Sequence, residues 1–532
     1  MFNACDYLLD RRLATGDGDR VALAGAQGDI TYAGLHDRVC RTAAGLRAAG
    51  LQPEQRVLLL MADSPAFVVT YLAAMRIGAV PVPASTMLRP DGVAELLRDS
   101  RARFLAVTGE FAATAARAAA QAPELAGLLT AAAVSGTAPG DEGAGIAGGA
   151  IPAGLAVHAL ADLARSAPDE SVYGTSADSP AFWLYTSGTT GTPKGAMHRH
   201  GAIEVVCEAY GARVLGIRPG DRCLSAAKAF FAYGLGNSVL FPLSAGAASV
   251  LCAPPARPDL VAEAVAAHGP TLFFAGPTFF AAMLRAGLPA GALRGVRLAA
   301  SAGEALPASL YARWTGHFGV DIIDGIGMTE MLHIFLSNAP GQVRPGTTGR
   351  AVPGYELKLV DEDTGLAAGD DAPATLFVRG ASAATGYWSR YDASRQVFQG
   401  EWLRTGDTYV RDADGYYTCL GRTGDMIKAS GIWVSPMEVE ERLAAHPAVS
   451  QAVVIAAPDA DGLEKPVAYV ILAPGQVAGQ TVTEDELIEH CRAYLPSFKR
   501  PRKVVFTDAY PATATGKVRR VDLRALAATV LL

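Results

Sequence analysis

Short apolar segments alternate with helix-like segments along two long stretches of the chain. In the first stretch, residues 20–110, strand patterns flank a helical pattern over residues 66–77. In the second stretch, strand patterns recur and Pro277 begins a helical segment. The strand-like segments are residues 56–60, 79–82, 103–107, 271–275, 296–300 and 322–323. This alternation predicts an α/β fold with mostly parallel sheets that helices cover. Between the two stretches, residues 112–150 are rich in Ala and Gly, and we expect a surface loop there.

The composition of the chain changes along its length and indicates more than one domain. With 532 residues, the chain is longer than a single core normally allows. From about residue 344, turns rich in Gly, Asp and aromatic residues predict a β-rich subdomain over 346–421. We therefore expect a large N-terminal domain over residues 1–422 and a small mobile α+β domain over 425–532. The small domain shows strand patterns at 452–456, 467–472 and 504–506 and a helical pattern over 484–494.

Charge and cysteine content exclude several classes of protein. The net charge is −6 and the isoelectric point is near 5.9, whereas a nucleic-acid-binding protein usually carries a basic stripe. The seven cysteines are scattered and form no C-x-x-C pair, which argues against a zinc site and favours reduced thiols. No apolar run is long enough to cross a bilayer, and the N-terminus lacks a signal-peptide pattern. We therefore expect a cytoplasmic protein that acts without nucleic acid or membrane, as a monomer or a homodimer.

Residues 185–198 read Tyr-Thr-Ser-Gly-Thr-Thr-Gly-Thr-Pro-Lys-Gly-Ala-Met-His and combine hydroxyl side chains, glycines and one lysine. Glycine lets the backbone bend closely around a ligand, and exposed N–H groups make a nest for anionic oxygen. The apolar residues 181–185 predict a buried strand that leads into this loop. A Walker A loop does not fit, since Pro193 precedes Lys194 and Gly195 follows it. The pattern favours a polyphosphate site over a flexible linker, which composition alone leaves open.

Three of the predicted strands end in small or acidic residues. These ends lie at Thr186, at Ser301 and at Asp324. If the three strands are parallel neighbours, their carboxyl ends line one crevice, where ligands bind in open α/β sheets. The sequence therefore predicts a binding crevice at this edge of a sheet.

Four further motifs follow the loop in order along the chain. They are Asp-Gly-Ile-Gly-Met-Thr-Glu at 324–330, Thr-Gly-Asp at 405–407, Gly-Arg at 421–422 and Pro-Ala-Thr-Ala-Thr-Gly-Lys at 511–517. Together with residues 185–198, they resemble the signatures of the acyl-adenylate-forming (AMP-binding) superfamily, which includes acyl-CoA synthetases and aryl-CoA ligases. The five ordered matches span nearly the whole chain, so chance agreement is improbable.

The resemblance implies an AMP-forming ligase that uses ATP, Mg²⁺ and coenzyme A. An acid and ATP give acyl-AMP and pyrophosphate, and a thiol then takes the acyl group and releases AMP. By resemblance, Thr329 contacts the α-phosphate and Glu330 holds Mg²⁺, which favours a few carboxylate oxygens together with phosphate and water. The residues assigned to the β- and γ-phosphates are Thr186, Ser187, Gly188, Thr189, Thr190 and Lys194. The other residues assigned to the nucleotide are Ser301, Gly303, Glu304, Asp324, Gly325, Ile326, Asp407 and Arg422.

The resemblance also assigns catalytic roles to residues near the C-terminus. Lys517, in a loop rich in Pro, Thr and Gly, is expected to bridge the acid's carboxylate and the α-phosphate during adenylation. Lys428 and Gly431 match a lysine and a glycine that aryl-CoA ligases use in the thioester-forming conformation. The family's hinge residue is usually acidic, but this chain has Gly424 there. Glycine can still pivot, so rotation of the small domain between the half-reactions is expected.

Residues 230–237 and 331–338 resemble benzoate-CoA and hydroxybenzoate-CoA ligases and indicate the acid. By that resemblance, the acid pocket consists of Phe231, Ala232, Tyr233, Ala302, Gly327, His333 and Ile334. Small residues at Ala302 and Gly327 are expected to leave a flat slot between aromatic and aliphatic walls. His333 is expected to donate a hydrogen bond to the carboxylate or to a ring substituent. The pocket contains no lysine or arginine, so a dicarboxylate is not expected.

Three functions are consistent with these observations. The first is an aryl-CoA ligase that acts on benzoate or a closely related acid. The second is an enzyme that loads an aryl acid onto the phosphopantetheine of a carrier protein, because both acceptors share the same thiol arm. The third is a nucleotide-binding protein without activity, which the joint presence of Lys194, Glu330, Asp407, Arg422 and Lys517 disfavours.

Overall fold

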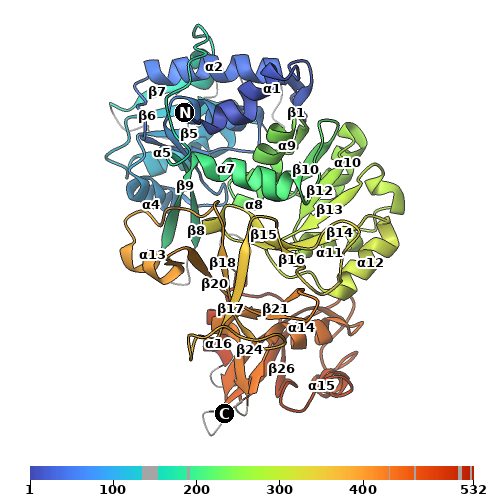
Figure 1. The fold of residues 1–532 in the computed structure, drawn as a ribbon. Helices are drawn as coiled ribbons and strands as arrows, with labels where there is room; N and C mark the ends of the chain where they lie inside the picture. Colours follow the sequence, from blue (N-terminus) through green and yellow to red (C-terminus); the bar gives the residue numbers. More distant parts are fainter. Residues whose placement is uncertain are drawn as a thin grey trace. The chain divides into compact units, whose positions relative to one another are not determined.

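The computed structural model describes residues 1–134, 154–187, 192–429, 432–459, 463–512, 518–527 and 530–531. The chain forms two compact units (Figure 1). Unit 1 comprises residues 1–356 and 379–403, and unit 2 comprises residues 357–378 and 404–532. The domain boundary expected at residues 422–425 lies within unit 2 and stays a prediction.

The larger sheet of unit 1 has the strand order β16-β15-β14-β13-β12-β10-β11-β1-β2. Its strands from β14 to β1 are parallel, whereas β2, β15 and β16 are antiparallel to their neighbours. The strands are β1 (Val21–Gly25), β2 (Ile30–Thr31), β10 (Arg222–Ser225), β11 (Ala248–Leu251), β12 (Leu272–Ala275), β13 (Leu298–Ser301), β14 (Ile322–Gly327), β15 (Ile334–Ser337) and β16 (Arg350–Ala351). The strands predicted at 271–275, 296–300 and 322–323 are therefore confirmed.

The second sheet of unit 1 is parallel throughout and has the order β4-β3-β5-β6-β7. Its strands are β3 (Arg56–Leu60), β4 (Val80–Pro83), β5 (Phe104–Thr108), β6 (Gly127–Ala131) and β7 (Ala156–Ala159). The prediction of a surface loop over residues 112–150 is wrong for the first part of that range, where α5 (Ala112–Ala119) and β6 form. Alanine is the best helix former, and buried alanines such as Ala115 and Ala118 pack into the core of this sheet. Residues 135–150 lie outside the described residues.

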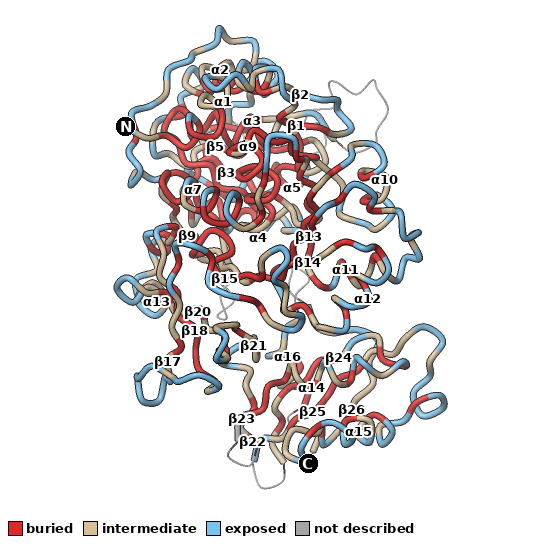
Figure 2. Tube along the Cα trace, turned by 45° about the vertical axis from the view of Figure 1, so that its right-hand side comes forward, coloured by how far each residue is buried: buried red, intermediate tan, exposed pale blue. Residues whose placement is uncertain are grey.

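Helices cover both sheets of unit 1, as the alternation predicts. They include α2 (Tyr32–Ala48), α3 (Pro65–Arg76), α4 (Pro90–Ser100), α10 (Pro258–His268), α11 (Pro277–Arg285) and α12 (Ala308–Phe318). Ser64 accepts a hydrogen bond from Phe67 N, so it caps α3 just before Pro65. Buried residues are concentrated in the strands and the inner helix faces (Figure 2). No helix within the described ranges has both the length and the apolar character needed to cross a membrane.

The loop at 185–198 connects two antiparallel strands rather than entering the large parallel sheet. Strand β8 (Pro180–Ser187) pairs with β9 (Pro193–Arg199), and Thr186 lies opposite Lys194. The buried strand predicted before the loop is confirmed, but the expectation that Thr186 ends a parallel neighbour of Ser301 is wrong. The physical reason is the short connection from β8 to β9, because a parallel pair needs a crossover of roughly a dozen residues or more. Strand β8 therefore pairs with the next strand in the chain, antiparallel, in a separate two-stranded sheet.

Unit 2 contains most of a five-stranded sheet and a separate three-stranded sheet. Most of the first sheet, β17 (Glu356–Val360), β18 (Ala374–Arg379), β20 (Trp402–Arg411) and β21 (Tyr417–Arg422), falls in the region predicted to be β-rich. The small sheet has the order β24-β25-β26, with β24 (Val449–Pro458), β25 (Glu464–Leu472) and β26 (Lys503–Phe506). Helices α14 (Pro436–Ala444) and α15 (Glu484–Arg492) share a core with this sheet that includes Val454, Val470 and Leu487. The predicted α+β pattern is therefore confirmed.

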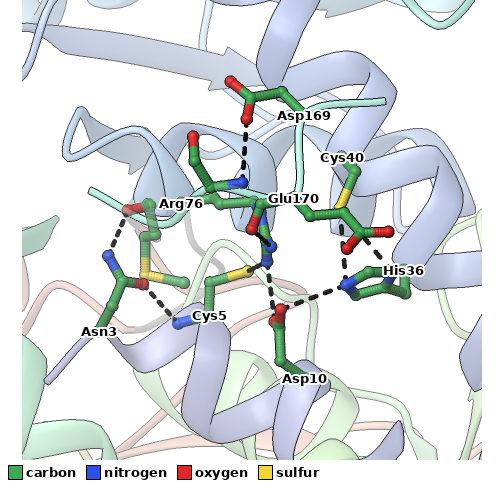
Figure 3. A network of polar contacts seen from close by, with 10 residues as sticks. Asn3, Cys5, Asp10, His36, Cys40, Arg76, Asp169 and Glu170 are labelled. Carbon is green, nitrogen blue, oxygen red and sulfur yellow. Dashed lines mark hydrogen bonds and ion pairs between the residues drawn. The ribbon is translucent and has the colours of Figure 1, made fainter. Parts of the chain in front are cut away.

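A buried arginine connects the N-terminal segment to helix α3 (Figure 3). Arg76, the last residue of α3, has no exposed surface. It donates hydrogen bonds to Asp10 Oδ2 at 2.8 Å and to the carbonyl oxygen of Glu170 at 2.5 Å. His36 Nε2 lies 3.2 Å from Asp10 Oδ1, and this hydrogen bond raises the pKa of His36 to about 9. The N-terminal segment, α2 and α3 are thus held together by buried charge.

Candidate active site

The carboxyl ends of β13 and β14 form the edge at which the sequence places nucleotide-binding residues. Ser301 and Asp324 are paired across these parallel strands, and both are buried. Burial raises the pKa of Asp324 to about 8. Immediately after β13, Gly303 has a φ of +94°, which favours glycine. The two strand ends are therefore neighbours, as expected, and the binding crevice at this edge stays a prediction.

The chain leaves β13 with one buried and two exposed residues. Ala302 is buried, whereas Gly303 and Glu304 are exposed. Thr278 Oγ1, on α11, donates a hydrogen bond of 2.9 Å to Glu304 Oε2. The edge thus offers backbone and polar groups to solvent directly beside the buried Asp324.

Strand β14 continues beyond Asp324 and forms a hairpin with β15. Gly327 lies opposite Ile334, and the turn η6 (Thr329–Met331) lies between the strands. A Cβ atom on Gly327 would lie 2.6 Å from the carbonyl oxygen of His333. Glycine is therefore required for the close approach of the two strands, a reason different from the flat slot expected from the sequence.

We predict that Gly327→Ala lowers kcat/KM for the acid by about 10²-fold, because the hairpin must open and displace His333 and η6. Steady-state kinetics with saturating nucleotide checks this. The matched control is Gly316→Ala in α12, where a new Cβ meets no atom within 4 Å, so kcat/KM should stay near the wild-type value. Equal kcat/KM for Gly327→Ala and the wild type would contradict the prediction.

An aromatic cluster lies beside this hairpin. Tyr233, on α8 (Ala232–Leu235), donates a hydrogen bond of 2.7 Å to the carbonyl oxygen of Ala300. The rings of Tyr233 and His333 are 5.5 Å apart, and the ring of Phe241 packs edge-on against His333. Ile334 and Ala302, which the sequence also assigns to the acid pocket, are buried. The pocket itself stays a prediction. Phe231, at the N-cap of α8, is partly buried.

The protonation of His333 follows from its surroundings. Its Nε2 lies 3.3 Å from the carbonyl oxygen of Tyr233, and a carbonyl can only accept, so Nε2 carries the proton. Burial lowers the pKa of His333 to about 3, which keeps the ring neutral. The other nitrogen, Nδ1, is buried without a hydrogen-bond partner among the described residues. The hydrogen bond from His333 to a bound acid or its ring substituent stays a prediction.

A second group of polar side chains lies at the turn η6. Tyr387 donates a hydrogen bond to Glu330 Oε1, and Lys194 Nζ lies 5.5 Å from the centre of the Tyr387 ring. His198 Nε2 donates a 2.9 Å hydrogen bond to the carbonyl oxygen of Thr329. Strand β9 therefore brings Lys194 close to the turn that carries Thr329 and Glu330.

The remaining residues predicted for the phosphates lie on the same β8–β9 hairpin. Thr186 is partly buried and faces Lys194 across the hairpin. The backbone of Ser187 ends β8, and Gly188, Thr189 and Thr190 lie outside the described residues. The described part of the loop thus places Thr186 and Lys194 opposite each other at its base.

Unit 2 carries the pair predicted to bind the ribose. Asp407 and Arg422 are opposite each other on β20 and β21, with Arg422 Nε 3.1 Å from Asp407 Oδ1. Lys428 lies in β22 (Ile427–Ala429), while Gly431 and Lys517 lie outside the described residues. At the predicted hinge, Arg524 donates a 2.8 Å hydrogen bond to the carbonyl oxygen of Gly424.

The chain matches two family models along most of its length. The model for AMP-binding enzymes matches residues 10–388, and the model for the C-terminal domain of AMP-binding enzymes matches residues 438–517. The chain belongs to the AMP-binding enzyme family. The resemblance inferred from the five motifs is therefore confirmed.

Individual relatives of this AMP-binding enzyme act on aromatic acids. The chain is 43% identical to benzoate–CoA ligase of Thauera aromatica, over 98% of this chain and 96% of that protein. It is 42% identical to 4-hydroxybenzoate–CoA/benzoate–CoA ligase of Rhodopseudomonas palustris, over 98% and 94% of the two chains. A crystal structure of a benzoate CoA ligase from Burkholderia xenovorans superimposes with a TM-score of 0.87 at 39% identity, covering 98% of this chain and all of that chain.

The donor set at Glu330 fits a magnesium ion that arrives with a nucleotide. Glu330 is buried, and within the described residues Tyr387 is hydrogen-bonded to one of its two carboxylate oxygens, Oε1. Within the described ranges, no group of three or more His, Cys, Asp or Glu residues is arranged to hold a metal ion. Mg²⁺ is usually bound by one or two carboxylates together with phosphates and water, so this AMP-binding enzyme is suited to a metal shared with its substrate.

Sequence reasoning missed two residues that shape the site. Tyr387 lies far from Glu330 in the sequence, and the Gly-Tyr-Trp segment that contains it has the composition of an ordinary turn. Gly236 allows His333 to lie against α8, because a Cβ there would be 2.3 Å from His333 Cδ2. The glycine was visible within residues 230–237, but nothing in the sequence indicates which ring approaches it.

Proposed function

We propose that this AMP-binding enzyme activates benzoate, or a closely related aryl carboxylic acid, and transfers the acyl group to coenzyme A. ATP and Mg²⁺ are required, and the products are aryl-CoA, AMP and pyrophosphate. The observation that carries the proposal is the hairpin β14-η6-β15. It connects the aromatic cluster of Tyr233 and His333 with the polar group of Glu330, Tyr387 and Lys194. An aromatic acid and a polyphosphate would thus meet on one rigid element.

In the first half-reaction, a carboxylate oxygen of the acid bonds to the α-phosphorus of ATP, and the bond from that phosphorus to pyrophosphate breaks. Negative charge moves onto the leaving group, so positioned donors and cations lower the barrier. We assign Lys194 and the loop hydroxyls to the pyrophosphate, Thr329 to the α-phosphate and Lys517 to the bridge between acid and phosphate. When bound at Glu330, Mg²⁺ neutralises phosphate charge.

In the second half-reaction, the thiol sulfur of coenzyme A attacks the acyl carbon, the bond from that carbon to AMP breaks, and the thiol proton leaves to solvent. We assign Lys428 and Gly431 to this step. Asp407 and Arg422 are assigned to the ribose in both steps, because a carboxylate can accept and a guanidinium group can donate hydrogen bonds to hydroxyls, and the two side chains lie side by side.

The pocket favours a flat apolar ring. Its walls are Tyr233, His333 and Ile334, and Gly327 and Ala302 add no bulk. The residues assigned to the pocket include no lysine or arginine, so a second carboxylate would be desolvated without a counter-charge. The seven free cysteines support a cytoplasmic location for the enzyme.

The test measures acid-dependent pyrophosphate release and acyl transfer with purified protein. We expect benzoate and its hydroxy, amino and halo derivatives to release pyrophosphate and to form thioesters with coenzyme A. A panel of kcat/KM values then identifies the preferred ring. Transfer to a carrier protein's phosphopantetheine, but not to coenzyme A, would replace the proposal with the carrier-loading function. Absence of pyrophosphate release with every acid would leave a nucleotide-binding protein without activity.

A further inference from the structure

Tyr387 lies between the two charged groups that the proposed reaction needs. Its hydroxyl donates to Glu330 Oε1, and the face of its ring lies 5.5 Å from Lys194 Nζ. The side chain is buried, with only 6% of its surface exposed. It therefore contacts the carboxylate and the ammonium group at once.

The backbone around Tyr387 holds the ring in this place. Tyr387 pairs with Ala196 on β9, and Trp388 N donates to the carbonyl oxygen of Gly195 at 2.9 Å. On the other side, Ala384 N donates to the carbonyl oxygen of Glu330 at 2.8 Å. Residues 384–388 are thus bonded both to the strand that carries Lys194 and to the turn that carries Glu330.

The side chain of Tyr387 has little freedom to leave the site. Its ring packs edge-on against Phe398 at 5.4 Å and lies in a small core with Ala196 and Ala384. From this fixed position the hydroxyl of Tyr387 donates its hydrogen bond to Glu330 Oε1.

A carboxylate that is held at one oxygen presents the other in a defined direction. Tyr387 is hydrogen-bonded to Oε1 of Glu330, and among the residues that the structure describes no hydrogen bond to Oε2 is formed, so Oε2 can take a ligand. We propose that Tyr387 is a positioning residue that aims Glu330 Oε2 at the Mg²⁺ of the bound nucleotide, and that its ring keeps Lys194 beside the same phosphates. This inference rests on the proposed function, in which Glu330 holds Mg²⁺ and Lys194 contacts pyrophosphate.

The test is Tyr387→Phe, which keeps the ring and its contact with Lys194 but removes the donor to Glu330. We expect the Mg²⁺ concentration for half-maximal acid-dependent ATP–pyrophosphate exchange to rise by about tenfold, the scale of one hydrogen bond to a charged group. Thioester formation from supplied acyl-AMP, which needs no metal at Glu330, should stay within about twofold of the wild type.

A binding measurement separates metal affinity from turnover. Mn²⁺ is titrated in the presence of α,β-methylene-ATP, which cannot release pyrophosphate, and bound metal is followed by electron paramagnetic resonance. Weaker Mn²⁺ binding in Tyr387→Phe supports the proposal. Unchanged Mn²⁺ binding together with unchanged Mg²⁺ dependence would overturn it.

Tyr355→Phe is the matched control. Tyr355 is also a buried tyrosine, with 5% of its surface exposed, and its hydroxyl lies 2.8 Å from Ser382 Oγ. Ser382 Oγ in turn donates to the carbonyl oxygen of Met331, next to Glu330. Tyr355→Phe disturbs the hydrogen bonds beside η6 without removing the donor to Glu330. We therefore expect this variant to show the wild-type Mg²⁺ dependence. A shift as large as that of Tyr387→Phe would overturn the specific role of Tyr387.

A double variant tests whether Tyr387 acts through Glu330. We expect Glu330→Gln and Glu330→Gln/Tyr387→Phe to share the same raised Mg²⁺ requirement. Without the Glu330 carboxylate, the Tyr387 hydroxyl has no metal ligand to orient, so its removal should have no further effect. Additive shifts would overturn the proposal while leaving the ligase function intact. A wild-type Mg²⁺ dependence in Glu330→Gln would overturn the metal role of Glu330 and the inference with it.

Discussion

Replacing Lys517 with alanine is expected to stop acyl-adenylate formation while thioester formation from supplied acyl-AMP continues. In the first half-reaction, charge develops between the acid's carboxylate and the α-phosphate, and the ammonium group of Lys517 is assigned to that place. The loss of one such preorganised cation costs on the order of 10²–10³ in rate or more. In the second half-reaction the phosphorus–oxygen bond has already formed, so the lysine has no charge to stabilise. Acid-dependent ATP–pyrophosphate exchange measures the first step, and coenzyme A consumption with synthetic acyl-AMP measures the second.

Lys503→Ala is the matched control for this experiment. Lys503 also lies in unit 2, but its Nζ forms a surface ion pair with Glu484 Oε2 at 3.0 Å. Both half-reactions should stay near their wild-type rates, because exposed ion pairs contribute little. Retention of acid-dependent exchange in Lys517→Ala would contradict the assignment. Loss of both half-reactions would instead indicate a folding defect.

Replacing Arg76 with alanine is expected to lower the free energy of unfolding by about 3–5 kcal/mol, the cost of breaking a buried ion pair. Arg76 has no exposed surface, and its guanidinium group contacts Asp10 and the carbonyl oxygen of Glu170. The substitution leaves the partly buried carboxylate of Asp10 with His36 as its remaining charged partner and removes the hydrogen bond to Glu170 O. Urea unfolding followed by tryptophan fluorescence checks this, because Trp183, Trp314, Trp388 and Trp402 all lie in unit 1.

An exposed ion pair with the same nitrogen–oxygen distance provides the control for Arg76. Arg165 Nη1 lies 2.8 Å from Asp162 Oδ1, the distance found for Arg76 and Asp10, but the Arg165 side chain is 81% exposed. Arg165→Ala should cost less than about 1 kcal/mol, because water screens the pair. Similar losses for Arg76→Ala and Arg165→Ala would show that burial does not decide the effect.

The secondary structure of unit 1 was largely predictable because its signals are local. The strand at 56–60 and the helix that begins at Pro277 were both recognised from short apolar runs and a proline at a helix start. The helix at 112–119 was missed because alanine-rich sequence suits both a helix and a loop. Burial against a sheet decided between them, and burial depends on partners elsewhere in the chain.

The loop at 185–198 shows where local reasoning stops. Its composition indicated a site for anionic oxygen, and Lys194 does lie beside Glu330 and Tyr387. The expectation that the strand before the loop belongs to the large parallel sheet was wrong, because β8 and β9 form an antiparallel hairpin outside that sheet. The short connection between the strands was a usable signal for that pairing.

In the candidate site, too, sequence motifs indicate which residues take part, whereas the tertiary structure shows how their atoms interact. Tyr233 and His333 were recognised as pocket residues by resemblance, and their rings do pack together. Which ring nitrogen of His333 carries the proton follows only from the nearby carbonyl oxygen of Tyr233. Neither residue type nor spacing carries that information, because a neutral histidine can protonate either nitrogen.

The sequence by itself determined the α/β class, the family and the residue types available for nucleotide, metal and acid. These follow from local periodicity and from ordered motifs, which need no knowledge of partners. Only the tertiary structure decided that Gly327 must lack a side chain, that Nδ1 of His333 is the free nitrogen and that Tyr387 contacts Glu330. Each of these depends on atoms that approach within a few ångströms from distant parts of the chain. Packing sets such distances, and no local pattern encodes them.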